Sequence, residues 1–173
     1  YVAYTPSVEL TGAVPVHIKL EHEDQFKLTP EKLKAAITPK TKAILMNFPS
    51  NPTGGVMTRE DYAKLVPILK EHEIIVISDE IYAELTYDGT FCSPANFNEI
   101  KDQVIIISGF SKAYAMTGWR LGWIASDEPL LSQMAKVHQY MVSSVPAFVQ
   151  HAAVRALGES VAPAREVYSE RRD

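Results

Sequence analysis

The chain has one cysteine, few glycines, and no long run of apolar or basic residues. With Cys92 as the single cysteine of 173 residues, no internal disulfide can form. The longest apolar runs, such as 74–77 and 104–107, have the length of a strand and are too short to span a bilayer, so no membrane role is expected. The net charge of -4 and the lack of clustered Lys and Arg argue against a nucleic-acid partner.

Two further absences narrow the class of protein. The five histidines have no metal-ligand spacing with one another or with Cys92, so no metal site is expected. The N-terminus lacks a positively charged start followed by an apolar secretory core, and a cytoplasmic location is therefore the expectation. The apolar content of 46% suffices for a substantial core, which indicates one globular domain.

Both ends of the chain look like the interior of a longer protein. It opens at Tyr1 without an initiator Met, and it closes at Asp173 inside a charged helical pattern with no stop signal. Residues 1–173 are therefore expected to be part of a larger chain, truncated at both ends.

Short β-branched runs alternate with segments of helical period, which is typical of an α/β protein with a mostly parallel sheet flanked by helices. The expected strands are Val14–Leu20, Ala43–Asn47, Ile74–Ser78, Val104–Ser108 and Leu121–Ala125. The expected helices are Pro30–Ile37, Thr58–Glu71 and a largely helical stretch, Glu128–Ala156, which Pro146 interrupts.

Lys112 lies in the stretch SGFSKAYAMTGWRLG, which spans Ser108–Gly122. An amine flanked by hydroxyls and followed by Arg120 suits a chain that holds an aldehyde cofactor covalently while gripping its phosphate. The alternative is an ordinary solvated lysine and an arginine paired with a carboxylate. Trp119 and Trp123 are expected to pack around Lys112.

Three more polar residues follow predicted strands, where open α/β sheets place their ligands. Asp79 follows a buried strand and suits a hydrogen bond to a protonated pyridine nitrogen; the alternative is a helix cap or turn residue. Tyr82 suits a bond to an oxygen of the same ring, or is an ordinary half-buried tyrosine. Asn51, on the rigid loop NFPSNPTGG, suits a ligand oxygen or serves only its turn. Tyr1 suits stacking on a heteroaromatic ring, or is a core aromatic.

Taken together, these motifs resemble the large domain of the pyridoxal-phosphate-dependent aminotransferases of class I and II, which have the fold type I architecture. The resemblance runs through the Tyr1 region, NPTGG, SDEIYAELTYDG and SKAYAMTGWRLG in that order and covers nearly the whole chain. It implies that residues 1–173 form part of the large cofactor-binding domain and that the small domain lies outside them.

The resemblance also implies roles at matching positions, with pyridoxal 5'-phosphate as cofactor. Lys112 would form the Schiff base and later move the substrate proton, and Asp79 would pair with the pyridine nitrogen. Asn51 and Tyr82 would bond the phenolic oxygen and Tyr1 would stack on the ring, while Arg120 and Ser111 would hold the phosphate. Some members have Ser three residues before the lysine, where this chain has Gly109, and Ser108 is the candidate to compensate.

The activity implied is transfer of an amino group from an L-amino acid to a 2-oxo acid, in a homodimer. Two alternatives stay open: a pyridoxal-phosphate lyase of the same fold, of the carbon-sulfur or ACC-synthase type, or a non-catalytic domain of a transcription regulator. In relatives, the phosphate loop precedes the region of Tyr1, and the arginine that binds the substrate carboxylate follows the region of Asp173.

Overall fold

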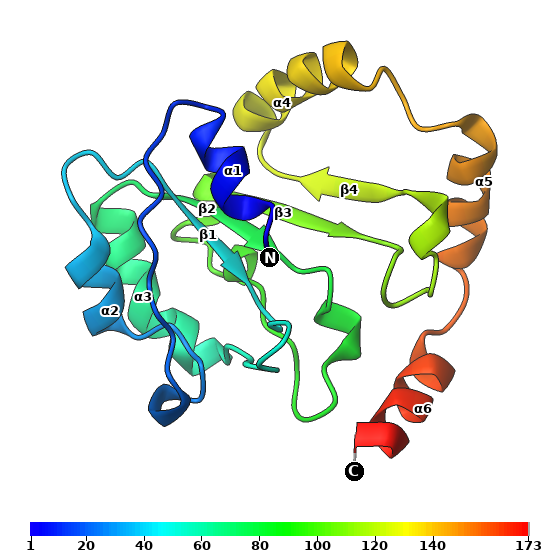
Figure 1. Ribbon diagram of the computed structural model, residues 1–173, viewed down its shortest axis with the longest axis horizontal. Coiled ribbons are helices and arrows are strands. Elements are labelled where there is room, and N and C mark those ends of the chain that lie inside the picture. Colours follow the sequence, from blue (N-terminus) through cyan, green and yellow to red (C-terminus); the bar gives the residue numbers. More distant parts are fainter. Residues whose placement is uncertain (173) are drawn as a thin grey trace.

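A computed structural model describes residues 1–172, which form an α/β fold around a mixed sheet (Figure 1). Its four strands are β1 (Ala43–Asn47), β2 (Ile75–Asp79), β3 (Val104–Gly109) and β4 (Gly122–Ala125), and they lie in sequence order. The pairs β1–β2 and β2–β3 are parallel, whereas β4 runs antiparallel to β3 at the edge. The predicted mostly parallel, mixed sheet is confirmed.

Helices flank the sheet. They are α1 (Tyr4–Glu9), α2 (Pro30–Ala36), α3 (Arg59–Glu71), α4 (Glu128–Met141), α5 (Ala147–Ala156) and α6 (Ala162–Arg172). Short 3-10 turns span His22–Asp24, Ala83–Leu85, Pro94–Asn96, Lys101–Gln103 and Thr117–Trp119. In Figure 1, α2 and α3 lie on the β1 side of the molecule, whereas α4, α5 and α6 follow one another around the β4 side. The predicted break at Pro146 is confirmed, because α4 ends at Met141 and α5 starts at Ala147.

Helix α3 begins where the sequence pattern places it. The Thr58 hydroxyl accepts the backbone N–H of Asp61 at 3.2 Å, and the Asp61 carboxylate accepts the N–H of Thr58 at 2.9 Å. This capping box satisfies two amides that an unpaired helix end would leave open. Tyr62, Leu65 and Leu69 then fall on one buried face at helical spacing, and they pack α3 into the core.

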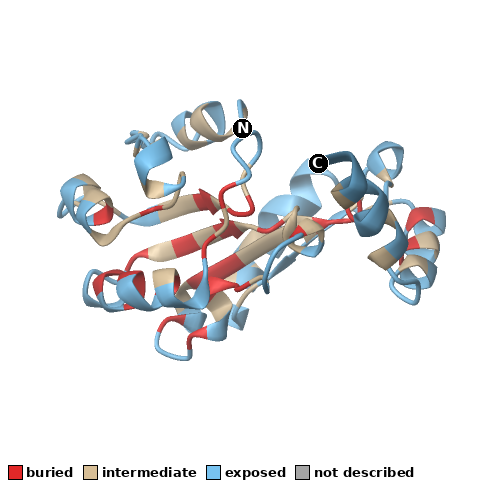
Figure 2. Ribbon diagram, turned by 90° about the horizontal axis from the view of Figure 1, so that it is seen from below, coloured by how far each residue is buried: buried red, intermediate tan, exposed pale blue. Residues whose placement is uncertain are grey.

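The core lies between α3 and one face of the sheet. Side chains alternate across a strand, so Met46, Val76 and Val104 point toward α3 and are buried. Figure 2 shows the buried residues concentrated along the strands. On β2, Ser78 faces this core and Asp79, the next residue, faces the other side of the sheet. The alternation therefore decides which polar side chains at the end of β2 are buried.

The predicted strand at Val14–Leu20 is wrong. This segment is extended but pairs with no strand, and it crosses toward α2 as part of the connection between α1 and α2. Its β-branched pattern is satisfied by side-chain packing instead, because Ile18 and Leu20 pack against the core. Pro15 also lacks the N–H that a central strand needs.

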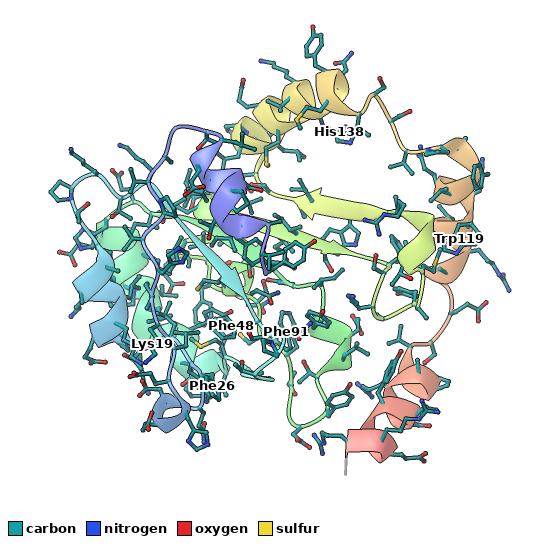
Figure 3. The ribbon with its side chains drawn as sticks, in the orientation of Figure 1. Lys19, Phe26, Phe48, Phe91, Trp119 and His138 are labelled. Atoms are coloured by element: carbon teal, nitrogen blue, oxygen red, sulfur yellow. The ribbon has the colours of Figure 1, made fainter. Side chains whose placement is uncertain are left out.

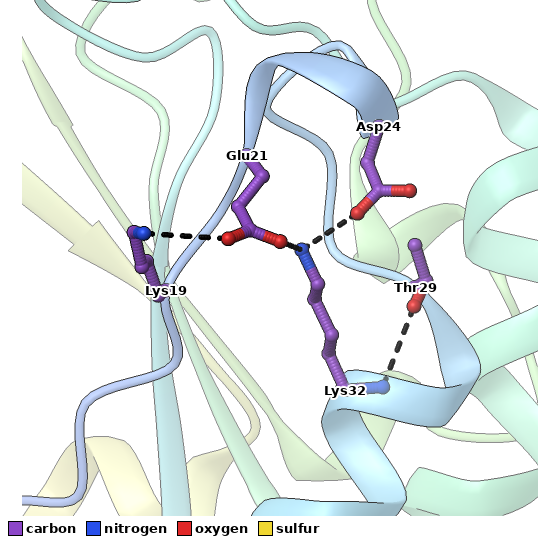
Figure 4. A network of polar contacts seen from close by, with 5 residues as sticks. All are labelled: Lys19, Glu21, Asp24, Thr29 and Lys32. Carbon is purple, nitrogen blue, oxygen red and sulfur yellow. Dashed lines mark hydrogen bonds and ion pairs between the residues drawn. The ribbon is translucent and has the colours of Figure 1, made fainter.

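Ion pairs attach the end of this connection to α2 (Figure 4). The Lys32 ammonium lies 2.6 Å from Asp24 and 3.3 Å from Glu21, and Lys19 lies 3.3 Å from Glu21. Hydrogen bonds to Asp24 raise the pKa of Lys32, and hydrogen bonds from Lys32 and Lys19 lower the pKa of Glu21. These groups are exposed enough for salt to screen the pairs, so the apolar contacts of Ile18 and Leu20 are the sturdier attachment.

Candidate functional site

The loops that follow β1, β2 and β3 line a partly open cavity of about 710 Å³. Pocket-lining residues come from 49–56, 82–88 and 111–117, and α6 adds Tyr168 and Arg172. All three loops leave the carboxyl ends of parallel strands, which is where open α/β sheets bind their ligands. The volume falls within the roughly 300–1,000 Å³ of small-molecule sites.

Lys112 lines this cavity from a loop that is anchored on both sides. Phe110 and Ala113 are buried, and the Met116 amide donates to the Phe110 carbonyl at 3.2 Å, which closes the loop. Lys112 is half-buried between them, and its Nζ lies 5.8 Å from the centroid of the Tyr82 ring. Ser111 lines the same cavity. The amine predicted from the sequence therefore lines a partly open cavity, close to an aromatic ring.

Asn51 and Tyr82 also line the cavity, and their side chains are hydrogen-bonded to each other. The Asn51 amide Nδ2 donates to the Tyr82 hydroxyl at 3.0 Å, which joins the loop after β1 to the loop after β2. The Asn51 loop is closed by two backbone bonds, from Gly54 to the Ser50 carbonyl at 2.8 Å and from Ser50 to the Gly55 carbonyl at 2.9 Å. Gly54 has φ +70, a conformation that a residue with a Cβ adopts at a cost. The predicted sharp turn is confirmed.

Asp79 is the last residue of β2, and both oxygens of its carboxylate are hydrogen-bonded. Oδ1 accepts the backbone N–H of Ile81 at 3.1 Å, and Oδ2 accepts the Tyr4 hydroxyl at 2.5 Å. The Asn47 amide donates to the backbone carbonyl of Asp79 at 3.0 Å, which ties β1 to β2 at this edge. The Ile81 contact is the one expected if Asp79 served only as a turn residue. The second oxygen, Oδ2, bonds in addition a side chain from α1.

Three predicted site residues, Asp79, Arg120 and Tyr1, are not among those that line the cavity. Arg120 is exposed, and its backbone has the left-handed conformation with φ 52. Its guanidinium donates a hydrogen bond to the Thr117 carbonyl at 2.9 Å. Thr117 lines the cavity, so Arg120 adjoins the wall without forming it. Tyr1 is 81% exposed, and its ring meets Tyr4 edge-on with centroids 5.5 Å apart. The expectation of a core aromatic at Tyr1 does not hold.

Gly109 is required by the close approach of β4. It pairs with Gly122, and a Cβ at Gly109 would lie 2.8 Å from the Leu121 carbonyl oxygen and 2.9 Å from the Gly122 Cα. A serine at this position would therefore push β3 and β4 apart. Ser108 does not replace it at the cavity, because its hydroxyl donates to the Glu80 carbonyl at 3.3 Å. Of these hydroxyls, Ser111 lies on the cavity wall.

The sequence did not identify Glu80 as a notable residue. Its side chain faces the core, where it accepts hydrogen bonds from Ser93 at 2.6 Å and from Ser78 at 3.0 Å. Burial raises the pKa of Glu80, and the two serine bonds oppose that rise. The nearby Asp79 charge adds to it. The only sequence signal is its place directly after Asp79, at the end of a buried strand.

The two tryptophans do not pack around Lys112 as expected. Trp119 and Trp123 are 44% and 45% exposed, and Figure 3 locates Trp119 in the turn before β4. Since β4 is an edge strand with every residue exposed, its neighbourhood offers no face on which these rings could be buried.

Across residues 1–172, no group of His, Cys, Asp and Glu side chains is arranged to hold a metal ion. In the same residues, no helix has both the length and the apolarity to cross a membrane.

The comparisons with known proteins agree with this geometry. The family model for aminotransferase class I and II matches residues 1–172. A putative aminotransferase of Bacillus subtilis, YugH, is 46% identical over 100% of this chain and 46% of its own length. An aspartate aminotransferase of the same organism is 40% identical over 96% of this chain and 43% of its own.

The solved structures show the same fold. An aromatic aminotransferase from Pyrococcus horikoshii superposes with a TM-score of 0.95 at 38% identity, over 99% of this chain and 48% of that one. The chain thus spans about half the length of the relatives it matches. Because the family model covers the described residues from end to end, the chain belongs to the class I and II aminotransferases, whose solved members share its fold.

Proposed function

We propose that this chain is the cofactor-binding part of an aminotransferase, which moves an amino group from an L-amino acid to a 2-oxo acid. The observation that carries the proposal is the meeting of Lys112 with the Asn51–Tyr82 pair in one cavity at the carboxyl ends of the strands. Residues 1–173 would form part of the large domain, and the small domain would lie outside them. The full-length protein would be a homodimer.

The residues of the cavity fit pyridoxal 5'-phosphate. An amine that can bind an aldehyde, Lys112, faces the same space as an amide and a phenol that suit a phenolic oxygen. The Asp79 carboxylate lies at the neighbouring strand end and suits a protonated ring nitrogen. Ser111 and Arg120 would hold the phosphate, and Tyr1 would cover the ring.

When bound, the cofactor's conjugated pyridine ring takes up the electron pair left behind when the Cα–H bond of the amino acid breaks. Lys112 would be the covalent attachment point of the cofactor. Its amine, once released by the incoming amino acid, would take the proton from the substrate Cα and deliver it to C4′ of the cofactor. Asp79 keeps the proton on the ring nitrogen. The half-buried position of Lys112 limits water around the amine while the proton moves.

The substrate is proposed only as a class. Relatives of similar identity are named for different substrates: aspartate at 40%, N-acetyl-LL-diaminopimelate at 39% and aromatic amino acids at 36%. Overall identity therefore does not select one amino acid.

Lys112→Ala in the full-length protein tests the attachment point. We expect loss of the yellow absorbance band of the bound cofactor and a fall in turnover of roughly 10²–10⁴-fold or more. The matched control is Lys136→Ala, which removes an exposed lysine from α4 and is expected to leave both unchanged. Retention of the yellow band in Lys112→Ala would rule out the assignment.

Asp79→Ala tests the role of the carboxylate. Since this group acts on the electron-withdrawing state of the ring, we expect turnover to fall roughly 100-fold or more, with a much smaller change in cofactor affinity. Asp102→Ala, at an exposed aspartate, is the control. Turnover equal to that of the unmodified protein at saturating cofactor would contradict the role.

An assay of products separates the transferase from the lyase of the same fold. A transferase consumes one amino acid and forms another, whereas the lyase releases a 2-oxo acid and ammonia. We expect stoichiometric formation of the new amino acid with no ammonia.

A further inference from the structure

Tyr4 and Asp79 are far apart in the sequence, but their side chains meet on one face of the sheet. The residues are 75 positions apart, and the Tyr4 hydroxyl lies 2.5 Å from the Asp79 Oδ2. Both side chains are half-buried. Hydrogen bonds from a hydroxyl to an ionised carboxylate have this short length and are about twice as strong as bonds between neutral groups.

The bond is directional, with Tyr4 as donor. Burial raises the pKa of Tyr4 well above its ordinary value, and the hydrogen bond and negative charge of Asp79 raise it further, with smaller effects of Tyr82 and Tyr1. The phenol therefore keeps its proton throughout the neutral range, and Asp79 is the acceptor. The other carboxylate oxygen is held by the Ile81 amide, so the plane of the carboxylate is defined from two sides.

Helix α1 presents Tyr4 on the face of the sheet to which Asp79 points. Asp79 faces away from the α3 core because side chains alternate along β2, and Glu80 takes the core side. The negative charge of Asp79 also lies beside the carboxyl of Glu80, whose pKa it raises. The neutral Tyr4 hydroxyl, which bonds Oδ2, offsets only part of the Asp79 charge, whereas a lysine in its place would neutralise that charge.

We infer that Tyr4 is a positioning residue for the proposed transamination, which holds the Asp79 carboxylate in the orientation that suits the ring nitrogen of the cofactor. The inference rests on the proposed function. Without the Tyr4 donor, the carboxylate keeps only the Ile81 hydrogen bond and can rotate away from that orientation, so it would hold the proton on the ring nitrogen less well. With the cofactor bound, a less cationic ring would withdraw fewer electrons from its bond to the Lys112 nitrogen, and that nitrogen would hold its proton to a higher pH.

The test compares Tyr4→Phe with the unmodified full-length protein, each loaded with pyridoxal 5'-phosphate carrying nitrogen-15 in its ring. We expect the ring nitrogen resonance of Tyr4→Phe to move toward that of neutral pyridine. The pH midpoint of the cofactor absorbance should rise by roughly 0.5 unit or more, and kcat should fall roughly tenfold. Tyr140→Phe removes the same hydroxyl from a side chain that is 90% exposed, and it should change none of these values.

A second comparison separates action through Asp79 from general support of α1. In an Asp79→Asn background, Tyr4→Phe should produce no further shift of the ring nitrogen, because the two residues act as one unit. The reciprocal measurement follows Tyr4 itself by carbon-13 NMR of the labelled phenol, and Asp79→Asn should lower its pKa. This second measurement needs no cofactor, so it holds even where Tyr4→Phe binds the cofactor poorly.

The outcomes distinguish the inference from the proposed function. Failure of the unmodified protein to form the yellow band would reject the proposed function. A yellow unmodified protein whose ring nitrogen and pH midpoint are unchanged in Tyr4→Phe would overturn the inference alone. A lower unfolding temperature of Tyr4→Phe with an unchanged ring nitrogen would assign the bond to docking of α1 and would likewise overturn it.

Discussion

At the scale of single residues, the end of β2 sorts two adjacent carboxyls into different environments. Asp79 is half-buried and bonded by Tyr4 and Ile81, whereas Glu80 is 6% exposed and bonded by two serines. Strand alternation alone explains the difference, since neighbouring side chains point to opposite faces. Asp79 thereby faces the side of the sheet from which α1 supplies Tyr4, and Glu80 faces the core.

Glu80 carries a prediction about pH. Its pKa in the folded protein lies above the ordinary value of 4.5 because of burial, so protonation favours the folded state. This stabilisation is fully present below the ordinary pKa and is lost as the pH rises through the raised one. Glu80→Gln stays neutral, so we expect it to lose less stability than the unmodified protein over that window.

Urea unfolding of the cofactor-free proteins at several pH values checks this. The control is Glu84→Gln. Glu84 lies four positions after Glu80 but is exposed, so this variant should behave like the unmodified protein. Parallel stability curves for Glu80→Gln and the unmodified protein, from acid to neutral pH, would contradict the prediction.

The sequence located most of the residues that gather at the site, but not their partners. Lys112, Asn51, Tyr82 and Ser111 do line one cavity. No sequence pattern links Tyr4 to Asp79, because the contact joins residues 75 positions apart.

At the scale of secondary-structure elements, the junction of β3 and β4 depends on two facing glycines. Gly109 and Gly122 are paired in the antiparallel register, and a Cβ at Gly109 would lie 2.8 Å from the Leu121 carbonyl oxygen. Lys112 follows this junction closely, so the approach of β4 helps to determine where the lysine loop leaves the sheet.

Gly109→Ala is expected to destabilise the protein by about 1–3 kcal/mol, since the contact is with backbone that has little freedom to move. The matched control is Gly118→Ala, where an added Cβ meets nothing within 4 Å and the change should stay within about 0.5 kcal/mol. Denaturant unfolding measures both. Equal stability of the two variants would show that the β3–β4 junction relaxes freely.

Elements with their own local signals were predicted well, and one without a partner was not. Thr58 with Asp61 marks the start of α3, and the parallel strands β1, β2 and β3 are short apolar runs with buried residues. Val14–Leu20 has strand-like alternation but no neighbouring strand, and hydrogen bonding to a neighbour is what makes a strand. Periodicity reports which side chains are buried, not what the backbone pairs with.

At the scale of the whole molecule, the β4 side is far less covered than the β1 side. Side chains such as Trp123, Ile124, Val137 and Phe148 are exposed, whereas α3 and the strands bury a continuous core. The relatives are about twice as long as this chain, which leaves room for further structure over that side.

The isolated chain of residues 1–173 is therefore expected to show little or no transaminase activity, even with pyridoxal 5'-phosphate supplied. It matches only about half of each relative, and we expect the substrate contacts of the proposed site to come in part from the remainder of the longer protein. Amino-group transfer by the purified chain is compared with that of the full-length protein under the same conditions. Measurable turnover by the isolated chain would contradict this expectation.

The sequence by itself determined the α/β class, the positions of four strands along the chain, and the set of polar residues that follow the parallel strands. It does so because strand runs, caps and turn glycines are local signals. The tertiary structure alone decided that Tyr4 bonds Asp79, that Glu80 is buried against Ser78 and Ser93, and that Val14–Leu20 stays unpaired. Those outcomes depend on contacts between segments far apart in the chain, and local patterns carry no information about which distant segment will be the neighbour.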